Sequence, residues 1–191
     1  MSRASLPVLP FPAEIDRRRF GHWLSGFTAG EGHFSLIVAN DKRTPAAQFV
    51  IGLRADDLSA LRLIQSYWGC GSIFYKPPTG RAQEQYFYKA VRIADLVSAV
   101  IPHFVEFPLR AKKQNDFQIW KEAVSFIDQV IRIPLTHLGG KDGSLRRWTP
   151  ERMDYIHTLI NALRTAREYQ APLPPIPPPP PLPPPEPGLF D

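Results

Sequence analysis

The amino-acid sequence predicts an α+β domain in which a four-stranded antiparallel sheet carries helices on one face. Three observations support this fold class. Four segments alternate apolar and polar residues, as half-buried strands do. The strands occur as two consecutive pairs, which favours two hairpins. Helical segments precede, separate and follow these pairs. An antiparallel sheet of this kind leaves its other face open to water or a ligand.

The first half of the chain contains the first helix, the first hairpin and the second helix. A helix is expected over residues 17–29 and a strand over 33–39. The strand at 47–55 separates two faces, one with Phe49, Ile51 and Leu53 and the other with Gln48, Val50, Gly52 and Arg54. The next helix, to Trp68, has apolar residues at helical spacing, and Asp56 or Asp57 is expected to cap its start.

The second half contains the second hairpin and three helices. A glycine turn at 69–71 precedes a third strand, and 84–93 is rich in aromatic and β-branched residues, as a fourth strand would be. A helix is expected from Ala94 to about Ile101, stopped by Pro102. A long amphipathic helix covers 111–131. The last helix has Thr149 as its N-cap and Pro150 as its first residue.

These elements divide the chain into four parts. We expect an N-terminal arm at 1–15, a core domain at 16–131, a loop with an added C-terminal helix at 132–170, and a proline-rich tail at 171–191. The tail should be an extended and disordered polyproline II segment. The alternative is that it docks into an aromatic-lined groove of a partner.

Charge and composition limit the class of protein. The net charge is +5, and the tail contributes only Glu186 and Asp191, so residues 1–170 carry +5 plus 2, or +7. This balance favours a polyanionic partner, although a merely basic domain is equally compatible with it. No apolar run approaches the roughly 20 residues of a membrane helix, so no membrane partner is expected. A single cysteine, Cys70, fits an intracellular location.

The segment "WLSGFTAGEGHF", residues 23–34, concentrates small residues at a helix-to-strand junction. Ser25 and Ala29 are four residues apart, and so are Gly26 and Gly30. Such spacing indicates close backbone contact with another helix, either within the chain or in an identical copy. Gly30 or Gly32 is expected to end the helix with a positive φ.

Glu31 follows this small-residue segment at the helix C-terminus, where a carboxylate is electrostatically unfavourable. If two such helices pair, two glutamates meet. They would repel each other unless a cation lies between them. Oxygen ligands of this kind suit Mg²⁺.

The stretch "LSGFTAGEG", residues 24–32, resembles the nine-residue signature of the LAGLIDADG homing endonucleases. Two further segments, "GLRADDLSALRLIQSYWGCGSIF" and "FPLRAKKQNDFQIWKEAV", are similar to later parts of that family in the same order. The resemblance covers about residues 20–130. It implies the family's αββαββα domain, with the sheet in the DNA major groove.

The resemblance also implies a function and a cofactor. It implies site-specific cleavage of double-stranded DNA at a long near-palindromic site with Mg²⁺ (or Mn²⁺), leaving 3′ overhangs. By position, Glu31 and the carbonyl of Gly30 would bind metal, and Lys112 would support catalysis, with Lys113 next. One signature copy implies a homodimer, with an interface formed by Leu24, Ser25, Gly26, Phe27, Ala29 and Gly30.

Two departures from the family pattern are visible. Ala29 stands where the signature usually has aspartate, and Leu53 stands where a polar residue is usual near the end of the second strand. They motivate an alternative function, a cleavage-inactive DNA-binding regulator or an RNA maturase acting on an intron. A third possibility is an interaction adaptor that uses the proline-rich tail.

The residues expected to contact DNA are those on the open face of the sheet and in the basic loops. Glutamine reads adenine and arginine or lysine reads guanine in the major groove, whereas phosphate contacts only position the protein. The set is His33, Ser35, Ile37, Gln48, Arg54, Lys76, Arg81, Lys89, Arg110 and Lys113. An intracellular DNA-binding enzyme of this kind would act in a bacterial cytoplasm or an organelle.

Overall fold

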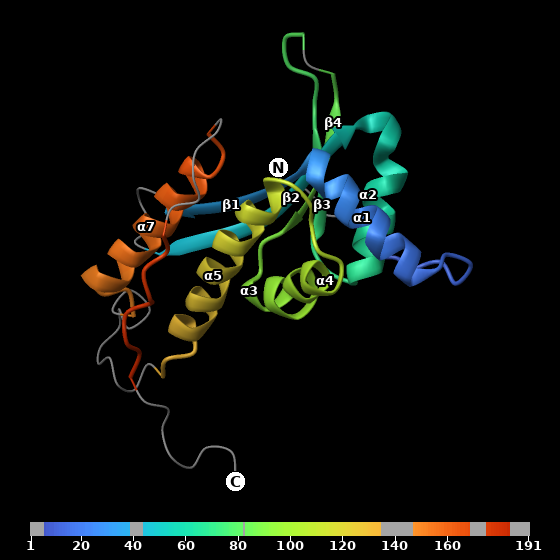
Figure 1. Cartoon of the computed structure of the whole chain (residues 1–191). Coiled ribbons are helices and arrows are strands. Elements are labelled where there is room, and N and C mark those ends of the chain that lie inside the picture. The colour runs from blue at the N-terminus through green and yellow to red at the C-terminus, as the bar shows by residue number, and fades with distance from the viewer. Residues whose placement is uncertain (1–5, 39–43, 82, 135–146, 169–174, 184–191) are drawn as a thin grey trace.

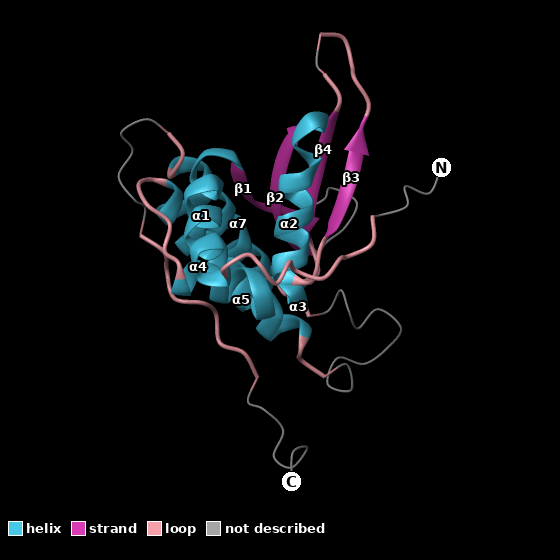
Figure 2. Ribbon diagram, turned by 90° about the vertical axis from the view of Figure 1, so that its right-hand side faces the viewer, coloured by secondary structure: helices cyan, strands magenta, loops and turns pink. Residues whose placement is uncertain are grey.

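The fold is a twisted antiparallel sheet with its helices gathered on one side (Figures 1 and 2). The computed structural model describes residues 6–38, 44–81, 83–134, 147–168 and 175–183. The strands are β1 (Gly32–Val38), β2 (Pro45–Arg54), β3 (Ser72–Lys76) and β4 (Gln85–Ala90). Their spatial order is β1-β2-β4-β3, and every neighbouring pair is antiparallel. The predicted fold class is confirmed.

Alternation along the strands places one set of side chains in the core. In β2, the buried residues are Ala47, Phe49, Ile51 and Leu53, and in β1 Phe34 and Leu36 are buried beside them. The intervening residues face away from the helices. Because the side-chain period of a strand is two, these residues form the opposite face of the sheet, which none of the helices in the described part of the chain covers.

Three helices that contact the sheet position the site. They are α1 (Arg17–Glu31), α2 (Leu58–Trp68) and α5 (Lys113–Ile131). Their apolar faces meet the sheet in a core rich in aromatic rings. Phe34, for example, lies 5.0 Å from Trp120 and 5.3 Å from Phe49 between ring centroids. The Trp120 indole also donates a hydrogen bond to the Ser35 carbonyl, which ties α5 to β1.

The prediction that Pro102 stops a helix is wrong. A continuous helical segment runs through α3 (Ile93–Asp95), η2 (Leu96–Val100) and α4 (Ile101–Glu106). The part named η2 is a π-helix immediately before the proline. Its wider turn shifts the carbonyls with which the proline ring would clash in a regular α-helix, so the helix continues.

The prediction that an aspartate caps α2 is also wrong. Asp57 occupies the N-cap but makes no capping hydrogen bond through its side chain, and a 3₁₀ turn, η1 (Ala55–Asp57), leads into the helix instead. The predicted glycine turn after α2 is confirmed, because Gly69 and Gly71 both have positive φ.

The C-terminal extension adds α7 (Pro150–Thr165), which packs on α5. Thr149 accepts a hydrogen bond from the Arg152 amide, so the predicted cap is confirmed. In the described part of the proline-rich tail, 175–183, Ile176 and Leu182 pack half-buried against the core. Two apolar side chains among the prolines thus gain burial on the domain.

The N-terminal arm also lies on the domain. Phe11 makes edge-to-face contacts with Phe20 of α1 and Tyr67 of α2, at centroid distances of 5.2 and 5.5 Å. Arg17 lies over the rings of both Phe11 and Tyr67. The described part of the arm therefore joins the first two helices rather than extending from them.

Candidate active site and nucleic-acid interface

Glu31 is the last residue of α1, and its side chain is exposed. The next residue, Gly32, begins β1, so the carboxylate stands where the first helix meets the sheet. The carbonyls in the last turn of a helix have no intrahelical donor, and Gly30 lies in this turn. The Glu31 carboxylate and the Gly30 carbonyl thus belong to the same exposed turn.

The prediction that a positive φ at Gly30 or Gly32 ends the helix is wrong. Gly32 has φ −79° and ψ 147°, which any residue can adopt. Glycine is required there by space. An added Cβ would lie 2.3 Å from Thr28 Cγ2 and 2.8 Å from the Thr28 carbonyl, which already accepts the Gly32 N–H. The tight turn that presents Glu31 therefore depends on the missing side chain.

The exposed face of α1 carries the glycines that could contact a second helix. Gly26 and Gly30 are exposed, and a Cβ added at either would meet nothing within 4 Å. Trp23 and Phe27 lie beside them with their rings stacked 4.8 Å apart, and Trp23 is 42% exposed. Ala29 is exposed on the same helix.

Two of the six predicted interface residues point the other way. Leu24 is fully buried and Ser25 nearly so, inside the chain's own core. The Ser25 hydroxyl donates to the Phe107 carbonyl at 2.6 Å and lies 3.3 Å from His103 Nε2. For Leu24 and Ser25 the assignment to a dimer interface is therefore wrong, because both are buried within the chain itself and Ser25 bonds to the end of α4.

The structure separates the two lysines of the basic loop. Lys113 Nζ donates at 3.1 Å to the carbonyl of Gly32, the residue that follows Glu31. Lys112 Nζ instead donates to the Glu168 carbonyl after α7. The neighbouring Ala111 has φ 54°, a left-handed conformation that costs an alanine about 1 kcal/mol. Both lysines follow this turn, and of the two it is Lys113 that bonds to the backbone next to Glu31.

A buried carboxylate, Asp116, supports this arrangement. Its Oδ2 atom lies 3.8 Å from Lys113 Nζ and 3.1 Å from Arg167 Nε. Arg167 also donates to the Phe34 carbonyl at 2.5 Å. The C-terminal extension thus supplies a cation to the α5–β1 contact next to the candidate site. Neither Asp116 nor Arg167 was predicted.

His33, the first exposed residue of β1, stands next to this cluster. Partial burial lowers its pKa, and the positive charges of Arg167 and Lys113 lower it further, against an opposing effect of Asp116. The imidazole is therefore neutral near pH 7. Neutral imidazole offers one hydrogen-bond donor and one acceptor to a ligand on the sheet.

The sheet face opposite the helices carries most of the predicted DNA-contacting residues. The strand register places them in cross-strand rows: His33 is opposite Val50, Val50 opposite Lys89, and Ser35 opposite Gln48. Ile37 continues the face and is 45% exposed. Arg81 lies exposed beyond β3, and Arg110 lies exposed before α5. Their exposure is compatible with the predicted contact.

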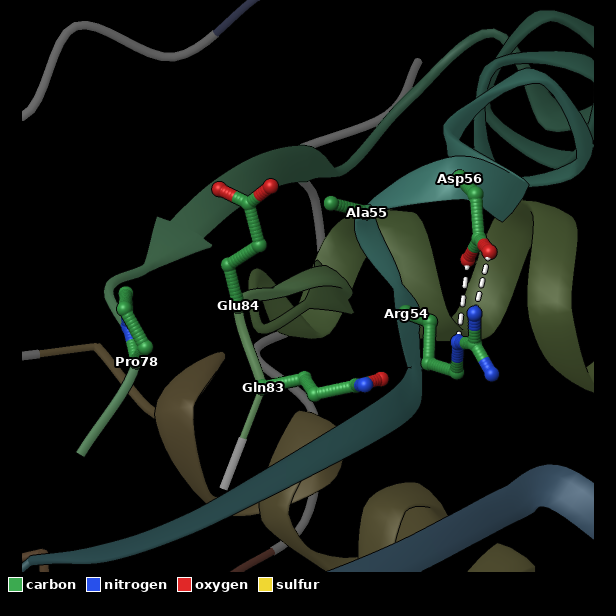
Figure 3. Close-up of a pocket in the computed structure, with 6 residues that line it drawn as sticks. All are labelled: Arg54, Ala55, Asp56, Pro78, Gln83 and Glu84. Carbon is green, nitrogen blue, oxygen red and sulfur yellow. Dashed lines mark hydrogen bonds and ion pairs between the residues drawn. The ribbon is translucent and has the colours of Figure 1, made fainter. Parts of the chain in front are cut away.

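Arg54 and Lys76 lie at the end of this face, where Arg54, Gln85 and Lys76 form one row. Arg54 is paired within the chain, since its guanidinium bonds both carboxylate oxygens of Asp56 at 3.2 and 2.5 Å (Figure 3). In the same hollow, Gln83 extends toward Arg54 while the Glu84 carboxylate points away from it. Both members of the ion pair are exposed, so a ligand could compete with Asp56 for Arg54.

A second hollow, of about 530 Å³, adjoins Glu31. Trp23, Phe27, Leu53, Arg54 and Asp57 line it together with Glu31. Leu53 is 9% exposed and belongs to the core side of β2, so it offers no polar group here. Over the described residues, no group of three or more histidine, cysteine, aspartate or glutamate side chains could hold a metal ion.

Comparison with known proteins identifies the family. The family model described as "LAGLIDADG endonuclease" matches residues 24–124, more than half of the chain. The chain belongs to the LAGLIDADG endonuclease family. The matched region begins with the signature and ends within α5, so it contains Glu31, the whole sheet and the basic loop.

Two curated fungal relatives of this LAGLIDADG chain illustrate the similarity. "Probable intron-encoded endonuclease 2" of Neurospora crassa is 27% identical over 125 residues, 65% of this chain and 24% of the relative. "Probable intron-encoded endonuclease 3" of the same organism is 32% identical over 117 residues, 58% of this chain and 21% of the relative. The chain thus spans about a quarter of the length of these relatives.

Solved structures of LAGLIDADG enzymes have the same fold. The I-SmaMI homing endonuclease bound to cleaved DNA matches with a TM-score of 0.60 at 21% identity, covering 78% of this chain and 45% of that one. I-GzeII in complex with its DNA target matches with a TM-score of 0.60 at 18% identity, covering 86% and 49%. At these identities the likeness shows the fold alone.

The donors at the LAGLIDADG junction fit a hard divalent cation. The Glu31 carboxylate and the Gly30 carbonyl are both oxygen donors, and Mg²⁺ prefers oxygen ligands. Mg²⁺ takes about six ligands in total. If Glu31 and Gly30 bind the ion, one chain would supply two of these ligands, and water, substrate oxygens or a second copy would complete the set.

Trp23, Phe74 and Phe87 had a sequence signal that prediction overlooked. Trp23, Gly26, Phe27 and Gly30 follow the spacing i, i+3, i+4, i+7 of a single helical face, which would have separated them from Leu24 and Ser25. Phe74 and Phe87 each stand two residues before a lysine already assigned to the open sheet face, Lys76 and Lys89, so a period of two places them on that face. Arg167 had no signal, because only tertiary contact brings it to Asp116.

Proposed function

We propose that this chain is a site-specific double-strand DNA endonuclease of the homing type, acting as a pair of identical copies around α1. The observation that carries the proposal is the exposed Glu31 at the junction of a glycine-faced helix and an uncovered polar sheet face. Family membership supports cleavage chemistry, and the net charge of +5 supports a polyanionic substrate.

The relatives suggest the biological setting. The two fungal relatives are named intron-encoded endonucleases, and I-SmaMI and I-GzeII were solved with DNA. By analogy, this chain would act on DNA at a site linked to an intron, inside an organelle or a bacterial cell. No described helix has both the length and the apolarity needed to cross a membrane.

In the proposed mechanism each copy contributes one acidic junction. The Glu31 carboxylate and the Gly30 carbonyl would hold Mg²⁺ or Mn²⁺, which when bound activates water and stabilises charge on the scissile phosphate. Lys113, held beside Glu31 through the Gly32 carbonyl, would stabilise negative charge on the phosphate oxygens. On this geometry we assign to Lys113 the supporting role first expected of Lys112.

Pairing would follow from the face of α1 that carries Gly26, Phe27, Ala29 and Gly30. The glycines let two helix backbones approach closely, and Trp23 and Phe27 would bury their rings in the contact. Such a pair is two-fold symmetric, so it would bring two Glu31 junctions together and read a near-palindromic target. Sedimentation velocity at micromolar concentration should show a dimer with target DNA, and a strict monomer in both states would contradict this pairing.

Cleavage is testable by selection from a randomised duplex library. With Mg²⁺ or Mn²⁺, the 191-residue chain should release fragments with 3′ overhangs from one long near-palindromic sequence, as read by sequencing the ends. Glu31→Gln should bind that sequence with unchanged affinity and cut it at least 100-fold more slowly. Cutting by Glu31→Gln at the wild-type rate would refute the assigned site.

A binding-only function is the second candidate. Ala29 and the buried Leu53 leave the junction without the additional polar groups that an active enzyme could use. The same experiment separates the two functions. Salt-dependent binding of duplex or intron RNA with no cutting in either metal would favour a regulator or maturase over the endonuclease.

A further inference from the structure

Two phenylalanine rings form a row across the open face of the sheet, outside the residues assigned to catalysis. The register aligns Gly52 of β2, Phe87 of β4 and Phe74 of β3 directly across the three strands. The Phe87 ring occupies the space above Gly52, where an added Cβ would lie 2.5 Å from the ring. Because residue 52 has no side chain, the Phe87 ring can pack directly against the backbone of β2. The row therefore presents an apolar surface close to the sheet.

Lysine side chains stand over this row. Lys89 Nζ lies 5.8 Å from the Phe74 ring centroid and 5.9 Å from that of Phe87, and Lys76 Nζ lies 5.9 Å from Phe87 on the other side. The rings and lysines belong to a hollow of about 490 Å³ that also includes Gln48 and Val91. The phenylalanine rings are apolar and the lysines beside them are cationic. Such a hollow suits a ligand that is anionic overall and has one apolar group.

The apolar row has no role in the protein's own core. Phe74 and Phe87 point away from the helices, and both are only half-buried. Half-exposed aromatic side chains on a surface without a helical cover commonly mark a binding surface. In the major groove each base pair offers polar edges, and the one apolar group is the 5-methyl of thymine.

We propose that the Phe74–Phe87 row selects thymine in the target by contact with its 5-methyl group. This inference rests on the proposed function, because it requires duplex DNA against the sheet. The lysine ammonium groups lie over the ring faces, which leaves the ring edges for contact. That arrangement favours a methyl group at the ring edge over an unpaired base stacked on the ring face.

Deoxyuridine provides a probe that differs from thymidine by this methyl group alone. Once the target has been selected, each thymine of a half-site is replaced in turn by deoxyuridine, and affinity is measured by fluorescence anisotropy with Ca²⁺ at fixed salt. Burial of one methyl group stabilises by an amount that converts to roughly a fourfold change in affinity. At one or two positions per half-site, the wild-type chain should bind the deoxyuridine duplex about fourfold more weakly.

Variants of the two phenylalanines test whether the Phe74–Phe87 row causes the difference in affinity between thymine and deoxyuridine duplexes. Phe87→Ala and Phe74→Ala should bind the thymine and deoxyuridine duplexes equally at those positions. Phe87→Leu, which keeps an apolar side chain, should retain part of the preference and covers the case in which Phe87→Ala does not fold. Lys89→Ala is the matched control, because it should weaken both duplexes equally and reduce the salt slope by about one.

Three results would overturn the proposal. Equal wild-type affinity for thymine and deoxyuridine at every position would refute it while leaving the endonuclease function intact. An unchanged thymine preference in both Phe87→Ala and Phe74→Ala would show that the row does not contact the methyl group. Failure of the wild-type chain to bind any duplex would refute the proposed function, and the inference with it.

Discussion

Replacing glycine by alanine near Glu31 should have opposite effects on the free energy of unfolding at positions 32 and 26. In Gly32→Ala, the new methyl group would lie 2.3 Å from Thr28 Cγ2 and 2.8 Å from the Thr28 carbonyl. The Thr28 side chain is completely buried, and its carbonyl is held by the Gly32 N–H. Neither atom can move without opening the end of α1, so we expect the free energy of unfolding to fall.

The size of the effect follows from overpacking. Forcing a methyl group into a filled site costs about 1–3 kcal/mol. For a chain of this length, that loss corresponds to a decrease in Tm of about 3–10 °C. Urea titration followed by far-ultraviolet circular dichroism measures it directly, and the m-value should not change.

Gly26→Ala is the matched control. Its methyl group would meet nothing within 4 Å, and alanine is favoured over glycine inside a helix by about 1 kcal/mol. At protein concentrations low enough for monomers, this variant should be more stable than wild type. At high concentration the same methyl group should weaken the proposed pairing, so sedimentation should show less dimer.

A double variant tests the cause. Thr28→Ser removes Cγ2, the atom closest to the added methyl group, and keeps the hydroxyl. The combination Thr28→Ser/Gly32→Ala should therefore lose less stability than the sum of the two single changes. A Gly32→Ala variant as stable as wild type, or strictly additive effects, would show that the packing of this turn does not require glycine.

Three further predictions concern other parts of the site and core. Lys113→Ala should slow single-turnover cleavage of the selected target by about 100-fold, whereas Lys112→Ala should change the rate less than tenfold. A larger loss of rate in Lys112→Ala than in Lys113→Ala would return the supporting role to Lys112. Arg167→Ala leaves Lys113 as the cation beside the buried Asp116 carboxylate. This change should lower the free energy of unfolding by about 2 kcal/mol in urea titrations. Adding Asp116→Asn to the same chain should recover part of that loss, because it removes the buried charge. Burial lowers the pKa of His103 to about 4 from 6.5, so the unfolded chain binds a proton that the folded chain does not. Stability should therefore fall by at most about 3 kcal/mol as pH decreases from 6.5 to 4, and His103→Gln, compared by urea titration at both pH values, should show a flatter dependence.

Sequence pattern predicted the strands because their alternation is local. The period of two in β2 assigned Phe49 and Ile51 to the core and Gln48 and Arg54 to the open face, and the register confirms both sets. Prediction from the sequence pattern failed where the same local sequence is compatible with two backbone structures. Pro102 was expected to stop a helix, but a π-helix before it lets the helix continue.

The candidate site was predictable in part for the same reason. The signature pointed to Glu31 because a carboxylate at a helix end among small residues is unusual in any fold. It could not tell which small residues faced inward. Ser25 and Gly26 are adjacent in sequence, yet one bonds to Phe107 in the core and the other faces solvent.

The sequence by itself determined the order of elements, the two faces of the sheet and the position of the acidic junction. Each of these is encoded by neighbours a few residues apart, through strand and helix periodicity. Only the tertiary structure decided that Lys113 rather than Lys112 lies beside Gly32, that Arg167 reaches Asp116, and that Phe87 lies over Gly52. These contacts join residues distant in the chain, and their geometry depends on how helices and strands pack in space.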